Sequence, residues 1–198
     1  MADINQVNYN YIIKWEGGLS CNKLDSASKH PVPDTPEHPN PKGYHTMRGV
    51  TWMAWRSIFK NNPQSIADFY KMPKDKWLKI YKWYWDLVGA SQIDNQIIAE
   101  LMADWAWGSG VNACFQLQKF LNLRYGYELK VDGKVGKRTI KALNDAIMKE
   151  GSVDCYKALF KFRCDWIKTI PSFRDFGRGW MNRLNDFDRW ALKELERG

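Results

Sequence analysis

Glu16 is the residue whose surroundings point most directly to chemistry, because it lies between Trp15 and the glycine pair Gly17-Gly18. Helically spaced apolar residues predict a helix that ends at these glycines: Ile4, Val7, Tyr11, Ile12 and Trp15. The exposed carbonyls of a helix C-terminus and apolar neighbours both disfavour a carboxylate anion, so the position predicts a raised pKa for Glu16. A carboxyl group that is protonated near neutral pH can donate its proton to a glycosidic oxygen. An ordinary surface glutamate near a helix end is the equally weighted alternative.

A glycosidase of the usual type also needs a second carboxylate, or another group that positions water. Asp25 lies nine residues after Glu16, across the glycine turn, where a loop can bring it opposite the first acid. Asp34 and Glu37 lie in the same loop and are alternatives. Each of these acids, taken singly, is more simply explained as a solvated loop residue, so the residues alone leave the second carboxylate open.

Residues 19–50 must position these acids, and this segment has few apolar residues and no periodicity. It contains five prolines: Pro31, Pro33, Pro36, Pro39 and Pro41. We therefore predict a long loop, of the kind that often carries function inside a domain. The loop also holds spaced residues of types that bind zinc, namely His30, Asp34, His38 and His45. Because the prolines exclude the helical geometry of an HExxH site, zinc binding is the minority interpretation.

The rest of the chain has the periodicity of helices and predicts a mainly α protein, with strands only as short pairs in the loop. Thr51 has the residue type of an N-cap for a helix over 52–59. Further helices are predicted over residues 77–88, 93–108, 112–122, 137–149, 152–169 and 179–196. Residues 131–136 form a glycine turn, which is either a wall-binding element or, as the physics favours, a tight connection between packed helices.

The composition is that of a folded protein, because 44% of its 198 residues are hydrophobic and 15% are aromatic. This length allows one large domain or two small lobes that share a core. The formal net charge of +8 suggests an anionic partner, such as nucleic acid, a membrane surface or the acidic bacterial wall. No nucleic-acid-binding motif is evident, so we expect no nucleic acid partner. The four cysteines lack CxxC spacing and are predicted to be free thiols.

The first residues are polar and do not resemble a secretory signal peptide. No apolar run approaches the roughly 18–20 residues that span a bilayer, so we expect no stable membrane insertion. Synthesis in the cytoplasm is therefore expected, and any work outside it needs another exit route.

Two N-terminal segments together resemble glycoside hydrolase family 108, the lysozyme-like muramidases of phages and bacteria that are also described as secretion activators. They are residues 15–19 (Trp-Glu-Gly-Gly-Leu) and 43–51 (Gly-Tyr-His-Thr-Met-Arg-Gly-Val-Thr). Three later segments resemble the peptidoglycan-binding half that accompanies this family: residues 104–110, 131–136 and 177–180. The resemblance covers nearly the whole chain, and it implies a lysozyme-like helical fold of two closely packed lobes with a long Pro-rich active-site loop.

The family pattern places an Asp about nine residues after its Glu and implies that Asp25 is this residue. Thr46 matches the family threonine, which would help to hold a water or the Asp. In the family the Asp nearly adjoins a glycine pair, whereas here about seventeen residues separate Asp25 from Gly43, and Tyr44 replaces the second glycine. This insertion leaves Asp25 and Asp34 as alternatives for the second carboxylate.

The resemblance thus predicts a catalytic lobe over residues 1–92, a peptidoglycan-binding helical lobe over 93–198, and hydrolysis of the bond between N-acetylmuramic acid and N-acetylglucosamine. The predicted catalytic residues are Glu16, Asp25 and Thr46, and the predicted substrate-binding residues are Trp15, Tyr44, His45, Asp104 and Trp107. We expect bacterial peptidoglycan as the partner, a monomer, no metal or other cofactor, and action on the cell wall after release. A zinc-dependent wall amidase or peptidase, which a chelator would inhibit, and a non-catalytic wall-binding protein, which would release no reducing ends, are the alternatives.

Overall fold

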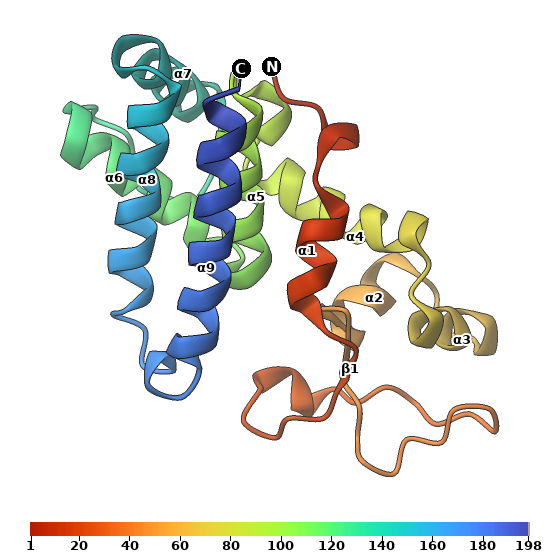
Figure 1. Cartoon of the computed structure of the whole chain (residues 1–198). Coiled ribbons are helices and arrows are strands. Elements are labelled where there is room, and N and C mark those ends of the chain that lie inside the picture. The colour runs from red at the N-terminus through yellow and green to blue at the C-terminus, as the bar shows by residue number, and fades with distance from the viewer. Residues whose placement is uncertain (198) are drawn as a thin grey trace. The chain divides into compact units, whose positions relative to one another are not determined.

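The computed structural model describes residues 1–197 and is mainly α-helical, as predicted (Figure 1). Two units can be distinguished by their internal contacts, and the division falls inside the helix α4 (Lys74–Leu87). One unit comprises Asn8–Lys82, and the other combines Met1–Val7 with the chain from Trp83 onward.

The chain begins with two short helices where the sequence predicted one. A 3-10 helix, η1 (Ile4–Gln6), is followed by the α-helix α1 (Tyr9–Glu16). The break occurs because Asn8 acts as an N-cap, its side-chain oxygen accepting a hydrogen bond from the backbone N–H of Tyr11 at 3.1 Å. The apolar stripe was therefore a correct indication of helix in the α1 part only.

The Asn8–Lys82 unit contains a small sheet, short helices and a long loop. Its strands are β1 (Leu19–Ser20), β2 (Thr46–Met47) and β3 (Val50–Thr51), joined antiparallel in the order β1-β2-β3. Its further helices are η2 (Ser26–Lys29), α2 (Trp52–Ile58), α3 (Pro63–Lys71) and the first part of α4. The predicted N-cap is confirmed, because the Thr51 hydroxyl accepts a hydrogen bond from the N–H of Ala54 at 3.0 Å.

Aromatic side chains form the core of this unit. Trp55, Phe69 and Trp77 are fully buried. The ring of Phe69 contacts the ring of Trp55 edge-on at 5.6 Å, and the indole N–H of Trp55 donates to Ser65 Oγ at 3.0 Å. Burial of large rings whose polar atoms remain hydrogen-bonded stabilises a small unit that has little regular structure.

The unit that begins at Trp83 is a helical bundle. A 3-10 helix, η3 (Ala90–Gln92), precedes the first complete helix of this bundle. Its helices are α5 (Gln96–Ser109), α6 (Asn112–Tyr125), α7 (Lys137–Glu150), α8 (Ser152–Ile167) and α9 (Phe173–Leu195). Every residue of α5 from Ile97 to Ala106 is buried, and α5 packs against α6, α8 and α9 (Figure 1). These helices agree with the predicted ranges, except that α9 starts earlier and continues through Gly177, which packs on the ring of Phe173.

The turn over residues 131–136 is fixed by the side chain of Gln118. Its Oε1 accepts hydrogen bonds from the N–H groups of Asp132 and Gly133 at 3.0 and 2.9 Å, and its Nε2 donates to the Lys134 carbonyl at 3.1 Å. Gly133 has a φ of +73° and lies against the ring of Phe115. These contacts fit the interpretation of this motif as a tight connection between two packed helices.

All four cysteines are free thiols, as predicted: Cys21, Cys114, Cys155 and Cys164. Within residues 1–197, no helix has both the length and the apolar character needed to cross a membrane.

Candidate active site

Glu16 is the last residue of α1, and the glycine turn after it leads directly into the sheet. Gly17 has a φ of +60°, a conformation that L side chains rarely adopt and that glycine adopts readily. Strand β1 begins at Leu19, three residues after Glu16. Both Glu16 and Trp15 are half-buried, and Lys14 Nζ lies 5.5 Å from the centre of the Trp15 ring. The turn therefore ties the position of Glu16 to that of the sheet.

The register of the sheet places Thr46 next to this turn. Ser20 on β1 pairs with Thr46 on β2, and Thr46 in turn pairs with Thr51 on β3. Strands β2 and β3 are joined by Arg48 and Gly49, both with positive φ (47° and 74°), which is the backbone of a two-residue type I′ hairpin. Thr46 is half-buried on the central strand, so its position is fixed from both sides.

Asp25 and His45 are adjacent in the structure although twenty residues separate them in the sequence. Asp25 caps η2, with Oδ1 accepting a hydrogen bond from the N–H of Ala27 at 2.8 Å. Its Oδ2 lies 3.8 Å from Nε2 of His45. The Asp25 side chain is 42% exposed, whereas that of His45 is 0% exposed. Asp25 can therefore meet a ligand, while the neighbouring His45 lies in the interior.

His45 was predicted to line the substrate groove, and its complete burial gives it a different place. Its backbone belongs to the sheet region, because its N–H donates to the Ser20 carbonyl at 3.0 Å and its carbonyl accepts from Trp52 at 2.9 Å. Its Nδ1 lies 3.3 Å from the Gly43 carbonyl oxygen. The imidazole therefore lies between the end of the loop and Asp25 and does not face solvent.

Asp34, the alternative second carboxylate, makes a hydrogen bond within its own loop. Its Oδ1 accepts a hydrogen bond from the N–H of Asn40 at 2.8 Å. Asn40, which is 6% exposed, donates from Nδ2 to the carbonyls of Val32 and Tyr44 at 2.8 and 3.1 Å. The Tyr44 N–H donates to Asn40 Oδ1 at 2.5 Å, so the amide holds both sides of the loop together. Tyr44 is half-buried at the end of this bracing.

Asn40 and Arg48 are structurally important residues that sequence reasoning missed. The Arg48 carbonyl accepts a hydrogen bond from Trp77 Nε1 at 3.1 Å, and Arg48 Nη1 donates to the Tyr9 hydroxyl at 3.3 Å. These bonds connect the hairpin to α1 and α4. An asparagine among prolines can indicate a side chain that braces turns, but no pattern in the sequence identified the partners of Asn40 or Arg48.

The three histidines of the loop have different surroundings and are not grouped together. The His38 ring stacks on that of Tyr70, with ring centres 4.5 Å apart and an interplanar angle of 22°. His30 is exposed, and His45 is buried beside Asp25. In the described part of the chain, no three His, Cys, Asp or Glu side chains are grouped so as to hold a metal ion.

The other two predicted substrate-binding residues, Asp104 and Trp107, belong to the unit that begins at Trp83. Asp104 is 2% exposed, and its two oxygens pair with Arg163 Nη2 at 2.9 Å and Arg183 Nη2 at 2.5 Å. Burial alone would raise the pKa of Asp104, but the two arginines outweigh it and lower the pKa. Asp104 therefore lies beneath the surface of this unit, paired with the two arginines. Trp107 is half-buried, with its ring 5.1 Å from that of Tyr84.

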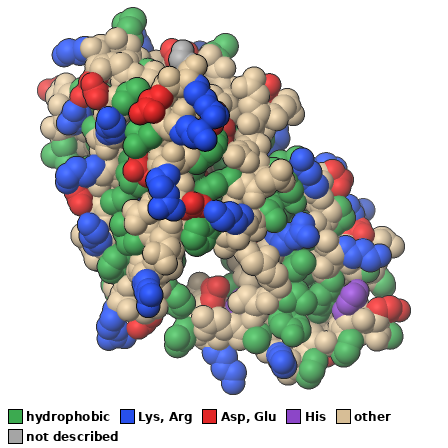
Figure 2. Space-filling view, viewed as in Figure 1, with side chains coloured by type: hydrophobic (Ala, Val, Ile, Leu, Met, Phe, Trp, Pro, Cys, Tyr) green, Lys and Arg blue, Asp and Glu red, His purple; other side chains and the backbone are tan. Residues whose placement is uncertain are grey.

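The positive charge is dispersed over the face of the molecule that is visible in Figure 2. On the face shown in Figure 2, Lys and Arg side chains are spread among acidic and hydrophobic ones and do not gather into one stripe. A net charge of +8 distributed in this way suits general attraction to an anionic polymer better than a dedicated groove for a nucleic acid backbone.

Comparison with known proteins identifies the family to which this chain belongs. Residues 9–110 match the family model described as glycosyl hydrolase 108. The chain belongs to this family. Residues 112–185 match a second model, described as a predicted peptidoglycan domain. Both parts of the resemblance found in the sequence are thereby confirmed.

A solved structure supports the fold. SagA of Brucella abortus is similar with a TM-score of 0.67 and 23% sequence identity, over 93% of this chain and 91% of that chain. At this level of identity the likeness shows the fold alone. No curated protein matches the chain. The two family matches together indicate a glycoside hydrolase with a peptidoglycan-hydrolase-like function and peptidoglycan as its partner.

Proposed function

We propose that this family 108 protein is an N-acetylmuramidase, which hydrolyses the bond between N-acetylmuramic acid and N-acetylglucosamine. The observation that carries the proposal is the position of Glu16, where α1 ends and a glycine turn passes into the sheet that bears Thr46. In this role Glu16 protonates the glycosidic oxygen as the bond breaks. The hydrolytic step consumes one water and leaves a new reducing end on muramic acid.

We assign the second carboxylate to Asp25 rather than Asp34. Asp25 adjoins His45, the residue directly before Thr46, and Oδ2 of Asp25 is free of the backbone bond that Oδ1 makes. Asp34 instead accepts from the backbone of its own loop, where it fixes Asn40. Asp25 then positions or activates water, or stabilises the positive charge that develops on the sugar, and Thr46 helps to hold the water or the carboxylate.

Sugar contacts are assigned to half-buried aromatic residues, because a partly exposed ring offers a flat face to a sugar. Trp15 and Tyr44 of the Asn8–Lys82 unit meet this condition. Trp107 of the other unit meets it as well. Alanine at one of these positions should raise KM more than it lowers kcat, because uniform binding energy is lost.

Digestion of purified peptidoglycan by the full chain and by Glu16→Gln tests the proposal. The wild type should release fragments with new reducing ends at muramic acid, and Glu16→Gln should be about 10²–10⁴-fold slower, the usual contribution of a general acid. Glu37→Gln is the matched control, because Glu37 is an exposed glutamate in the loop that follows the glycine turn.

Mass analysis of the fragments separates the competing activities. Anhydro-muramic ends would indicate a transglycosylase, and cleaved peptide bonds with loss of activity in chelator would indicate a zinc-dependent amidase or peptidase. Near-normal activity of Glu16→Gln would overturn the assignment of the acid. If the wild type bound peptidoglycan without cleaving it, the protein would be a non-catalytic wall-binding protein.

A further inference from the structure

Two positively charged side chains converge on Tyr9, the first residue of α1. Arg48 Nη1 donates a hydrogen bond to the Tyr9 hydroxyl at 3.3 Å, and Lys74 Nζ lies 4.8 Å from the centre of the Tyr9 ring. Lys74 is the first residue of α4, and all three residues belong to the Asn8–Lys82 unit. These three residues, which come from separate parts of the chain, are called the Tyr9 cluster below.

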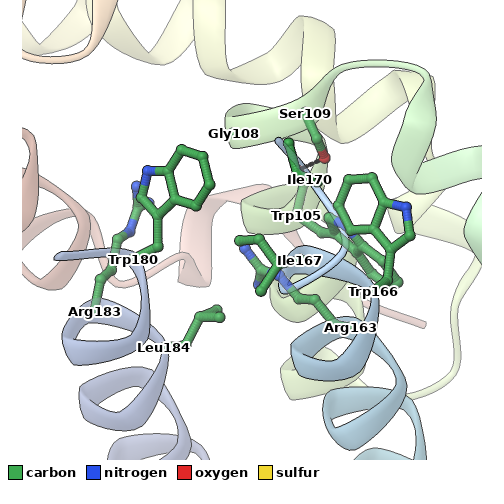
Figure 3. A pocket seen from close by; sticks show the side chains of 10 residues that line it. All are labelled: Trp105, Gly108, Ser109, Arg163, Trp166, Ile167, Ile170, Trp180, Arg183 and Leu184. Atoms are coloured by element: carbon green, nitrogen blue, oxygen red, sulfur yellow. Dashed lines mark hydrogen bonds between the residues drawn. The ribbon is translucent and has the colours of Figure 1, made fainter. Parts of the chain in front are cut away.

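The two cations of the Tyr9 cluster have no acidic partner. Within residues 1–197, no carboxylate lies within 4 Å of the Arg48 guanidinium or the Lys74 ammonium group. The first turn of α1 contains no acidic residue, so the partial positive charge of its helix terminus adds to theirs. In the helical unit, by contrast, two arginines pair with Asp104 beside a cavity that is lined by indole rings (Figure 3). The Tyr9 cluster is therefore suited to an anion from outside the chain.

Arg48 is held in place and still has donors for a ligand. Its N–H donates to the Gly18 carbonyl at 3.4 Å, and its carbonyl accepts from Trp77 Nε1 at 3.1 Å, so its backbone is fixed on both sides. Arg48 is half-buried, and in the described chain only Nη1 of its side chain has a hydrogen-bond partner. Nε and Nη2 are not among the fully buried nitrogens that lack a partner, so a ligand can reach them. A guanidinium group can bind a carboxylate through two parallel hydrogen bonds.

The Tyr9 cluster lies on the same face of α1 as Glu16. Seven residues, close to two helical turns, separate Tyr9 from Glu16, which places them about 10 Å apart along the helix axis. The bond between Arg48 and Gly18 also joins the hairpin to the turn that follows Glu16. A ligand of a few sugar units can therefore contact both Glu16 and the Tyr9 cluster.

We propose that the Tyr9 cluster binds a carboxylate of the glycan strand and thereby selects strands that contain muramic acid. Muramic acid differs from glucosamine by a lactyl ether, which ends in a carboxylate or carries a stem peptide with carboxylates of its own. A strand of N-acetylglucosamine alone is uncharged and leaves both cations unpaired. The wall strand as the source rests on the proposed function, whereas the binding of a carboxylate does not. Arg48 and Lys74 are then specificity-determining residues.

The affinities of the Glu16→Gln variant for three matched ligands test the proposal. The ligands are a peptide-free oligomer of alternating N-acetylglucosamine and N-acetylmuramic acid, the same oligomer with its carboxylates converted to methylamides, and a chitin oligomer of equal length. In calorimetric titrations, the free acid should bind at least about tenfold more tightly than either uncharged ligand. This ratio should fall as salt rises from about 50 mM to about 500 mM, because salt screens exposed charges.

An oligomer that carries intact stem peptides distinguishes the two sources of the carboxylate. Binding as weak as that of the methylamide would identify the lactyl carboxylate as the ligand. Binding as tight as that of the free acid would show that carboxylates of the peptide also occupy the site. Both results support the proposal. It is overturned if neither the free acid nor the peptide-bearing oligomer binds more tightly than the uncharged ligands.

Charge-removing variants locate the site. Arg48→Gln should weaken binding of the free acid about tenfold, and Lys74→Gln about threefold, because an exposed charge contributes less. Affinity for the methylamide should not change in either variant. Lys79→Gln is the matched control, since it removes an exposed lysine from another face of α4, and it should bind as the parent protein does. An unchanged preference for the acid in folded Arg48→Gln and Lys74→Gln would contradict the assignment.

Two further variants separate recognition of charge from a structural role. Arg48→Lys keeps the charge and should retain part of the preference, and it replaces Arg48→Gln if that variant does not fold. Tyr9→Phe removes only the hydroxyl that orients Arg48, so it should weaken binding of the free acid about threefold and leave the methylamide unaffected. Equal losses for all ligands would indicate that the Tyr9 cluster serves the fold alone.

These readouts are affinities, so their failure is distinguishable from a failure of the muramidase assignment. A chain that releases reducing ends at muramic acid but binds the acid and the methylamide equally would lose only the specificity site. A chain that prefers the free acid but cleaves no glycan would keep the Tyr9 cluster as a binding site. Cleavage of the ligands by Glu16→Gln would count against Glu16 as the acid, and the ratio of affinities would still report on the Tyr9 cluster.

Discussion

The buried imidazole of His45 lies directly behind the partly exposed carboxylate of Asp25, with 3.8 Å between Nε2 and Oδ2. This distance is just beyond that of a hydrogen bond, so a small movement of the loop would close it. The other ring nitrogen of His45, Nδ1, lies 3.3 Å from the Gly43 carbonyl. We therefore expect His45 to orient Asp25 during the reaction and to connect it to the end of the loop, as a positioning residue for the proposed reaction.

His45→Ala should lower kcat about 10–100-fold with little change in KM, because a displaced Asp25 disturbs the reacting geometry more than substrate binding. His45→Gln should recover part of this loss, since a glutamine side chain fills much of the same buried space and its amide N–H points a donor toward Asp25. Steady-state kinetics on soluble glycan fragments measure both constants. A parallel rise in KM and fall in thermal stability, without rescue by glutamine, would indicate a merely structural role.

Asp25→Asn should reduce kcat about 100-fold or more, whereas Asp34→Asn should stay within about fivefold of the wild type. The difference is expected because Asp34 serves the loop backbone, while Oδ2 of Asp25 is available to a ligand. Asp34→Asn should mainly increase proteolysis of the loop, since the bond to the Asn40 N–H is weakened. The reverse order of activities would transfer the second carboxylate to Asp34.

Much of the fold followed from the sequence because helical periodicity records which face of a segment is buried. The helices from α5 to α8 were predicted within a few residues for this reason. Local chemistry explains the errors. Asn8 caps α1 and splits the first helix, and the helix α9 tolerates Gly177 because that residue packs on Phe173. The helix α3 was missed altogether, although Asn62 caps it and Pro63 occupies its first turn.

The candidate site could be predicted only in part, because its long-range contacts leave no local pattern. Glu16 and Thr46 were identified from motifs, and the structure links them by the glycine turn and the sheet register. The burial of His45 and Asp104 was not foreseen, since a residue type does not reveal which neighbours will cover it. The bracing role of Asn40 likewise depends on loop segments eight residues apart.

Asp104→Asn should destabilise the chain by about 3–5 kcal/mol, because it removes the buried carboxylate that pairs with Arg163 and Arg183. Asp175→Asn is the matched control: Asp175 pairs with Arg174 on the surface, where such a pair contributes about 0–1 kcal/mol. Chemical denaturation followed by circular dichroism measures both free energies of unfolding. A loss below about 1 kcal/mol for Asp104→Asn would contradict the importance of the pair.

Acid should lower the stability of the wild-type protein, because Asp104 becomes protonated. The arginines keep the pKa of Asp104 in the folded state below its ordinary value of about 3.9. Its contribution to stability is therefore complete above that ordinary value and is lost as the pH falls through the lower, folded-state pKa. Thermal unfolding between pH 7 and pH 2 should show a shallower acid dependence for Asp104→Asn than for the wild type. Parallel curves for the two proteins would mean that Asp104 does not determine the acid dependence of stability.

Gly133→Ala should destabilise the chain by at least about 1–2 kcal/mol, because its φ of +73° is unfavourable for alanine. An added Cβ would also lie 2.7 Å from the Phe115 ring. Gly136→Ala is the control in the same turn, since its φ is −101° and an added Cβ would meet nothing within 4 Å. Equal free energies of unfolding for the two variants would show that the turn relaxes easily.

The four thiols should differ sharply in their reaction with Ellman's reagent. Cys21 is half-buried in the loop unit and should react in the native protein. Cys114 and Cys155 are fully buried, and burial raises the pKa of each to about 11, so almost none of either is thiolate at pH 8. Cys164 is buried too, and burial also raises its pKa.

Native protein at pH 8 should therefore show one fast thiol, which Cys21→Ser removes, and the other three should appear only in denaturant. Fast reaction of two or more thiols in the native state would mean that the helical unit opens locally at a free energy far below that of global unfolding. Because Cys114 lies in α6 and Cys155 in α8, the identity of the labelled residue would then show which helix opens first.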